Sequence, residues 1–169
     1  MTIKKSKAKQ VETKPAFKKA GNLTIENELI PGFLIFCHDA IEAKDGSLSL
    51  VRLIDRVTSN GLPAKLNNLT IVGEFLSSGE NSRDFDFELR IISPQKKALE
   101  VGPFKVSTNP DLQANRLVLK CQNFCFASAG VYKFELDALD GKTKQKYSIS
   151  RNLEVRTTGK LEVADATVI

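Results

Sequence analysis

Cys37, His38 and Asp39 are consecutive residues of the types that carry out nucleophilic and acid–base chemistry. A Cys–His pair acts when the imidazole takes the thiol proton, so the two side chains must lie within hydrogen-bond reach. The surrounding residues predict a strand, on which neighbouring side chains point to opposite faces, so Cys37 and His38 cannot serve each other. A thiol from elsewhere could reach His38, with Asp39 or another acid orienting it. Nothing in the sequence requires this arrangement, and we interpret His38, the only histidine, as a structural or surface residue.

Thiolates and imidazole are also zinc ligands, and Cys37, His38, Cys121 and Cys125 could together supply four. On a regular strand Cys121 and Cys125 share a face, but their thiols are about 13 Å apart at ~3.3 Å per residue. A bulge near Asn123 could shorten that distance, whereas the side chains of Cys37 and His38 diverge. We therefore predict no metal site and interpret the three cysteines as reduced, buried and packed like small hydrophobic residues.

Motifs of the common enzyme classes are missing from the sequence. It contains no P-loop, GxGxxG, GxSxG or HExxH pattern. The carboxylates alternate with apolar residues along expected strands, as in Asp84, Asp86 and Glu88, which is typical of a solvated strand face. We predict a non-enzymatic protein with no catalytic residues and no cofactor.

Positive charge is concentrated in the first 20 residues, which hold seven lysines and one acid, Glu12. These 20 residues carry a net charge of +6, whereas the whole chain carries +5. The remaining residues therefore carry −1. We expect residues 1–22 to form a disordered tail when free. Such a tail either binds nucleic acid or an acidic partner through charge, or serves only as a solubilising extension. Its candidate contact residues are Lys4, Lys5, Lys7, Lys9, Lys14, Lys18 and Lys19.

A second basic run, Lys142, Lys144 and Lys146, alternates with Thr143, Gln145 and Tyr147. On a strand this spacing predicts a lysine stripe on one face of a hairpin. Such a stripe either protects an exposed edge strand from pairing or binds an anionic surface.

Length and composition predict one domain, over residues 23–158, followed by an extension at 159–169. The 169 residues are 41% hydrophobic, enough for a substantial core. No apolar run approaches the roughly 18 residues that span a bilayer, and no apolar segment follows the basic N-terminus as in a secretory signal. Three cysteines, an odd number, do not indicate a disulfide framework. These features favour a cytoplasmic protein that is not attached to a membrane.

Strand patterns separated by turn residues run from residue 32 almost to the C-terminus. The alternation in Asp84–Ile91 predicts one buried and one wet face. Residues 33–37 are apolar on both faces, so that strand is expected to be central or covered by a partner or the tail. We predict eight strands, at Gly32–Ala43, Ser47–Ser59, Lys65–Ser77, Arg83–Ser93, Ala98–Ser107, Ala114–Phe126, Val131–Leu139 and Thr143–Arg156.

The connections favour an antiparallel arrangement. Asp45-Gly46 and Asp140-Gly141 are typical hairpin turns, and no segment has the 3.6-residue apolar period of a helix. Eight short strands at this spacing predict a sandwich or a barrel, and we favour an antiparallel two-sheet β-sandwich of the immunoglobulin-like or C2-like kind. Tyr132, near the start of a strand, with Phe134 two residues later, resembles the E–F corner of immunoglobulin-like domains, where a tyrosine hydroxyl bonds to the backbone upstream.

A wider resemblance rests on Cys37-His38-Asp39, the segment 45–50 (DGSLSL), Asp55-Arg56-Val57 and, later, 130–136 (GVYKFEL) followed by Asp140-Gly141. With this pattern the chain resembles a family of uncharacterised bacterial β-sandwich domains over roughly residues 32–156. The resemblance implies the fold and a bacterial or phage origin. It brings no activity and no catalytic residues, and it does not include the lysine tail.

These observations predict an interaction module that binds another protein or assembles into a larger complex, including with copies of itself. The alternative is a nucleic-acid-associated protein that uses the lysine tail. The C-terminal residues 160–169 are mildly apolar and could add a strand to a partner.

Overall fold

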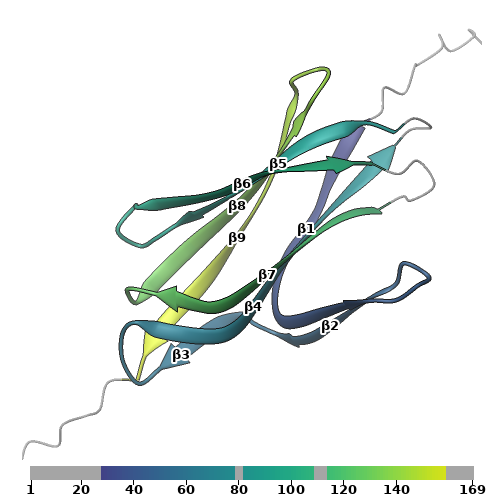
Figure 1. Ribbon diagram of the computed structural model, residues 1–169. Coiled ribbons are helices and arrows are strands. Elements are labelled where there is room, and N and C mark those ends of the chain that lie inside the picture. The colour runs from purple at the N-terminus through teal and green to yellow at the C-terminus, as the bar shows by residue number, and fades with distance from the viewer. Residues whose placement is uncertain (1–27, 79–81, 109–113, 159–169) are drawn as a thin grey trace, which may run out of the picture.

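The computed structural model describes residues 28–78, 82–108 and 114–158, and in these ranges the chain forms strands and no helix (Figure 1). The predicted tail at 1–22 and the extension at 159–169 lie outside the described residues. The strands are β1 Glu28–Glu42, β2 Leu48–Leu53, β3 Arg56–Ser59, β4 Ala64–Ser78, β5 Asp84–Ile92, β6 Ala98–Ser107, β7 Ala114–Phe126, β8 Gly130–Asp140 and β9 Lys146–Thr157.

The strands form two sheets that face each other, which confirms the predicted sandwich. The first sheet has the order β2-β1-β4-β7 and the second β3-β9-β8-β5-β6. All neighbours are antiparallel except β3 and β9, which run parallel. Neither sheet closes on itself, so the fold is not a barrel. No helix of the described residues is long and apolar enough to cross a membrane.

The predicted strand Ser47–Ser59 is wrong in one respect, because it consists of two strands in different sheets. The chain bends at Ile54 and Asp55, between β2 and β3. Arg52 has a φ of 52°, and the Ile54 side chain is buried while its N–H donates to the Phe36 carbonyl at 2.8 Å. Burial of Ile54 thus turns the chain inward and directs β3 to the second sheet.

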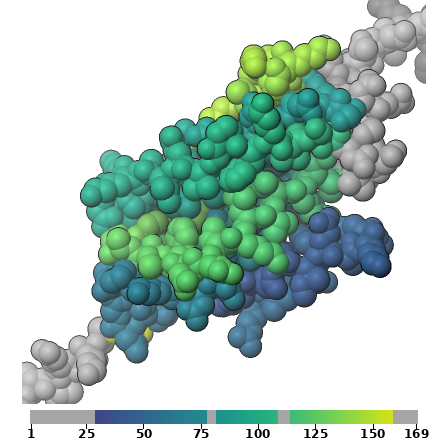
Figure 2. All heavy atoms as spheres, viewed as in Figure 1, coloured from purple at the N-terminus to yellow at the C-terminus, as the bar shows by residue number. Residues whose placement is uncertain are grey.

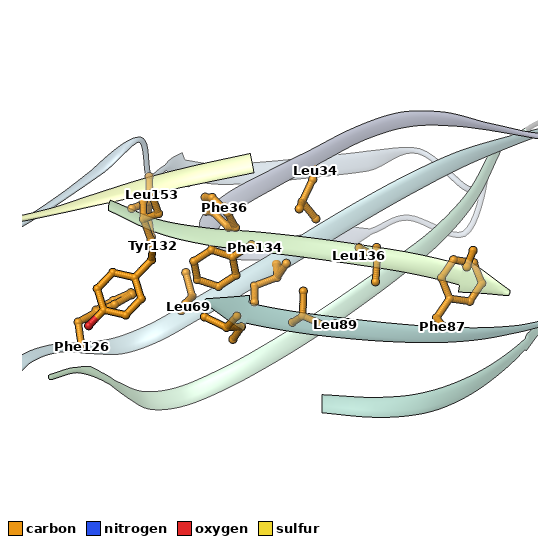
Figure 3. Packing of buried hydrophobic residues seen from close by; sticks show 14 of the residues in the cluster. Leu34, Phe36, Leu69, Phe87, Leu89, Phe126, Tyr132, Phe134, Leu136 and Leu153 are labelled. Atoms are coloured by element: carbon orange, nitrogen blue, oxygen red, sulfur yellow. The ribbon is translucent and has the colours of Figure 1, made fainter. Parts of the chain in front are cut away.

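Phenylalanine rings from both sheets fill the space between them (Figure 3). Phe36 on β1 faces Phe134 on β8 with ring centroids 4.6 Å apart, and Phe126 packs against Tyr132 at 5.0 Å. On β5 every second side chain from Phe85 to Ile91 is buried, as the alternation predicts. The Phe–Phe contacts across the sheets fix their spacing and their relative register.

β1 is a central strand, as one of the two predicted alternatives has it, and its hairpin partner β2 packs on its outer face. β1 lies between β2 and β4, and its residue Cys37 is fully buried. Cys37, Ala40 and Val72 form a small cluster against which Leu48 and Leu50 of β2 pack. The hairpin is closed by the predicted Asp45-Gly46 turn, where Gly46 has a φ of 79°.

Tyr132 makes the backbone contacts expected from its position at the start of β8. Its hydroxyl accepts a hydrogen bond from the Ser128 N–H at 3.1 Å and donates to the Ser128 carbonyl at 3.2 Å. The ring is buried, so these bonds satisfy a hydroxyl that would otherwise be costly to remove from water. The turn between β7 and β8 is thereby tied to the core.

Phe87→Ala is expected to lower the free energy of unfolding by about 3–5 kcal/mol, because the ring is buried against Phe75 and Phe85. Glu88→Ala on the opposite face is expected to change it by no more than about 0.5 kcal/mol. Chemical denaturation of both variants measures the difference. Equal effects would contradict the assigned orientation of β5.

Candidate functional site

One long side of the sandwich is closed. There β3 crosses from the β2 side and pairs in parallel with β9. Arg151 of β9 spans the two sheets: it donates to the Leu34 carbonyl at 3.2 Å, pairs with Asp55 at 2.7 Å, and lies over the Phe36 ring at 5.8 Å from its centroid. Backbone pairing and a cationic side chain together cover this side of the core.

In the part of the chain that the structure describes, the other long side, between β6 and β7, is open. These strands end their respective sheets, and no described strand pairs with the far side of either. Figure 2 looks onto this side, with β6 above β7. Their inward side chains pack on the core but are only partly buried, and we call them the rim: Val101, Phe104, Val106, Leu117, Leu119, Cys121 and Phe124. Among the described residues, the other partly buried side chains packed on the core are Leu66 and Ile149.

The short link between β6 and β7 explains this open side. Only residues 108–113 join the end of one sheet to the end of the other. Six residues at ~3.3 Å each can cross the roughly 10 Å between packed sheets, but they cannot also supply a further strand with its turns. In the described residues no further strand therefore covers the inner faces of β6 and β7 on this side.

The two edge strands differ in how well they could accept another strand. In β6, Pro103 lacks an N–H, and the register with β5 shifts between Phe87 and Leu89. Such bulges and prolines protect an edge from pairing. β7 has no proline over its 13 residues, and every second residue of an edge strand directs its N–H and C=O outward. β7 is thus the more receptive edge.

The outer face of β7 is polar except at Val118 and carries cations with fixed partners. Arg116 pairs with Glu74 of β4 at 2.8 Å and donates to the Gly46 carbonyl of the β1–β2 turn at 2.7 Å. Lys120 pairs with Asp39 of β1 at 2.8 Å. The side of β7 that faces the rim is apolar, so the strand is amphipathic.

The predicted common face of Cys121 and Cys125 is wrong, because the alternation of β7 shifts at Asn123. Asn123 has a φ of 53°; before it Leu119 and Cys121 point inward, and after it Phe124 and Phe126 do. Cys125 is therefore exposed, contrary to the prediction that the cysteines are buried, while Cys121 lies on the rim.

Cys37 is separated from both, on the outer face of the first sheet, and burial raises the pKa of the Cys37 and Cys121 thiols. All three are free thiols. In the described ranges no three His, Cys, Asp or Glu residues come together in a way that could hold a metal ion. His38 is half-buried on β1, where its carbonyl accepts a bond from the Thr70 hydroxyl.

The structure does not form the predicted lysine stripe. β9 begins at Lys146, three residues later than predicted, so Lys142 and Lys144 lie in the β8–β9 turn. Lys146 pairs with Asp137 at 2.8 Å, whereas Lys142 and Lys144 are exposed. The candidate lysines of the tail, from Lys4 to Lys19, lie outside the described residues.

Sequence reasoning missed the buried carboxylate beneath this turn. Asp140 is fully buried; its Oδ1 accepts from the N–H groups of Lys142 and Thr143 at 2.7 and 2.9 Å, and its Oδ2 faces the Arg83 guanidinium. Burial alone would raise the pKa of Asp140, but the two N–H bonds and Arg83 outweigh it and lower the pKa below its ordinary value. Asp140-Gly141 reads only as a turn in the sequence, since Arg83 is distant along the chain.

The rim was also missed, and local patterns hold no signal for it. Leu117 and Leu119 lie with Val118 in a short apolar run between Arg116 and Lys120, as ordinary core positions of a strand can. Their partial exposure depends on the strand order, which places β7 at an edge. Proline at position 103 was the one available hint that β6 is an edge strand.

Comparison with known protein families gives a match over most of the described strands. A family model described as a family of unknown function matches residues 32–150, which include β2 to β8 and most of β1. No curated protein matches the chain. The matched span contains both strands of the rim.

Asp140→Asn is expected to lower the free energy of unfolding at pH 7 by about 1–3 kcal/mol, because Asn keeps the turn acceptor but cannot pair with Arg83. Since folding lowers the pKa of Asp140, its contribution is present above the unfolded-state pKa and is lost as the pH falls through the folded-state value.

The difference between the two proteins should therefore shrink below about pH 4. Urea titrations between pH 3 and 7 measure it. Asp45→Asn, in the exposed β1–β2 turn, is the matched control and should have a much smaller effect. A difference for Asp140→Asn that stays constant across this range would contradict the assignment.

Proposed function

The chain belongs to this family of unknown function, DUF6941, and we propose that it is a non-enzymatic interaction module that binds a protein segment along the open side between β6 and β7. The observation that carries the proposal is the rim, whose apolar side chains are only partly covered. An extended segment laid beside β7 would continue the sheet with backbone hydrogen bonds. Its alternate side chains would fill the space between the sheets.

The strand order supports this proposal. We propose an immunoglobulin-like topology in which β4 and β7 take the places of strands B and E, and β5, β8 and β9 those of C, F and G. Tyr132 then occupies the tyrosine corner at the start of strand F. In that arrangement a strand D lies beside E, and here β7 has no described neighbour on that side. The binding site would be the position of the absent strand.

A role without catalysis is supported by how the ionisable groups are used. Asp39, Glu74, Asp137 and Asp140 each pair with a lysine or arginine, which removes them as free general bases. The half-buried His38 has no thiol on its own face of the strand, because the neighbouring Cys37 points away from it.

We further propose a cytoplasmic setting in a bacterium or a phage-infected bacterium. Three free thiols support a reducing compartment, since an exposed thiol such as Cys125 is prone to oxidation elsewhere. No cofactor is required for this role.

Site-specific photocrosslinking in cells that naturally produce the protein tests the proposed function. A photoreactive residue at Leu119, on the rim, is expected to form protein adducts identifiable by mass spectrometry. The same residue at Val131 is the control, since Val131 is 51% exposed on the outer face of the second sheet. Equal adducts at both positions, or none at Leu119, would overturn the proposal.

Nucleic-acid binding is the second candidate, supported by the position of the β8–β9 turn relative to the first described residue, Glu28. Glu28, where β1 begins, pairs with Ser78 at the end of β4, and Gly141 donates to the Asp84 carbonyl at the start of β5. The β8–β9 turn with Lys142 and Lys144 therefore lies at the same end of the sandwich as the start of β1 (Figure 1).

If this second function holds, affinity for DNA or RNA should fall steeply with salt, because each phosphate contact releases counterions. Removing residues 1–20 changes the net charge from +5 to −1, since they carry +6, and should abolish binding with little change in thermal stability. Lys142→Ser with Lys144→Ser is the comparison variant that tests the turn. Fluorescence anisotropy measures all three proteins, and absence of binding by the full chain at low salt would rule this function out.

A further inference from the structure

The rim specifies the chemistry of the segment that would cover it, and this inference rests on the proposed function. A strand beside β7 must offer small or branched apolar side chains at alternate positions to the partly buried Leu117, Leu119 and Cys121. Its intervening side chains would lie on the outer face, beside Arg116 and Lys120. An acidic or neutral residue suits those positions, and a cation does not.

Two segments of this chain would fit the open side poorly, namely β7 of a second copy and the lysine-rich N-terminal segment. In an antiparallel pair of two β7 strands centred on Val118, Arg116 of one copy lies opposite Lys120 of the other, and like charges directly opposite are destabilising. The N-terminal segment carries seven lysines in its first 20 residues, so it would bring further positive charge to this face.

Residues 160–169 fit better. They read KLEVADATVI, with no proline or glycine and several residues that favour strands. Leu161 and Val163 are spaced to point into the rim together, and Glu162 between them would then lie on the outer face beside the cations of β7. On a regular strand Asp165 shares the face of Leu161 and Val163 and Lys160 shares that of Glu162, so the part of the segment that suits the rim is Leu161 to Ala164. The ten residues are comparable in length with the strands of the sandwich.

Residues 160–169 follow β9, and from there they reach the rim of the same molecule only with difficulty. β9 ends at Thr157 beside β3, while β6 lies three strands away from β9 in the same sheet. Crossing that distance takes about 14 Å at ~4.8 Å per strand, and the change of sheet adds to it. Thr158 still donates to the Ser59 carbonyl, so about five residues from 159 onward would be spent on the crossing, among them Leu161 and Val163. When the segment binds the rim of a second copy, no such crossing is needed, and all of residues 160–169 can pair with β7.

We propose that the open side beside β7 accepts residues 160–169 of a second copy of this chain, which pairs with β7 as an added strand and places Leu161 and Val163 against the rim. The acceptor and donor surfaces are at different places on the molecule. The protein would therefore assemble either as a reciprocal dimer or as a head-to-tail chain.

Two variants separate the surfaces. A chain that ends at Thr158 keeps every described strand and the rim, so it can only accept. The full chain with Leu119→Lys keeps the segment but places a charge on the rim, so it can only donate. By analytical ultracentrifugation the unmodified chain is expected to self-associate, each variant alone to be monomeric, and their equimolar mixture to form a one-to-one complex. Self-association of the shortened chain as strong as that of the full chain, or a mixture that stays monomeric, would overturn the proposal.

A synthetic peptide of residues 158–169 gives a second arm that does not depend on the folding of Leu119→Lys. The fluorescent peptide is expected to bind the shortened chain, and the peptide with Leu161→Lys and Val163→Lys is expected to bind at least tenfold more weakly. Equal binding of both peptides, or none by either, would refute the proposal. Crosslinks from Leu119 to a different protein, together with no peptide binding, would leave the proposed function standing and refute only this occupant.

Discussion

Contact between side chains is what holds the two sheets together, because in the described residues no backbone ladder joins one sheet to the other. The packing of Phe36 on Phe134, with Phe126 on Tyr132 beyond it, sets the distance between the layers. This spacing determines which strands have covered inner faces. A sheet edge whose inward side chains lack an opposing strand stays partly wet, whatever its sequence.

The two long sides of the sandwich differ in how the inward side chains at the sheet edges are covered. On one side the bend at Ile54 sends β3 across to β9, and Arg151 spans the remaining opening between Leu34 and Asp55. On the other side the link of residues 108–113 is too short to supply a strand. The asymmetry follows from chain lengths between strands rather than from the hydrophobicity of any one strand. It leaves β7 with an apolar inner face, a largely polar outer face and a backbone edge that pairs with no other described strand.

Much of this architecture can be predicted from local patterns, since strand periodicity reports burial directly. The alternation from Phe85 to Ile91 predicts the buried face of β5, and the limits of β6 and β7 agree with the structure to the residue. The predicted Tyr132 hydroxyl bond is also present. The split at Ile54 was not predictable, because residues 47–59 form one continuous strand-like run and the sheet each half joins is a tertiary property.

The candidate site was predicted less well than the fold. Its residues become distinctive only through strand order, which joins positions far apart in the sequence. The reversal of Cys125 depends on the left-handed backbone at Asn123, and asparagine is one of the few residues that tolerates it. That signal was present but was considered only as a bulge. The Asp140–Arg83 pair had no comparable local signal.

The parallel pairing of β3 with β9 has a consequence for synthesis of the protein. Arg56 and Glu154 are 98 residues apart, and Leu34 and Arg151 are 117 apart. The contacts of the closed side therefore cannot form before β9 has been synthesised. A nascent chain grows from its N-terminus, and non-local pairing of this kind is slow to form. Until β9 has left the ribosome, β8 lacks its neighbour in the second sheet and β3 lacks its described partner. The closed side of the sandwich therefore forms only after β9 has been synthesised.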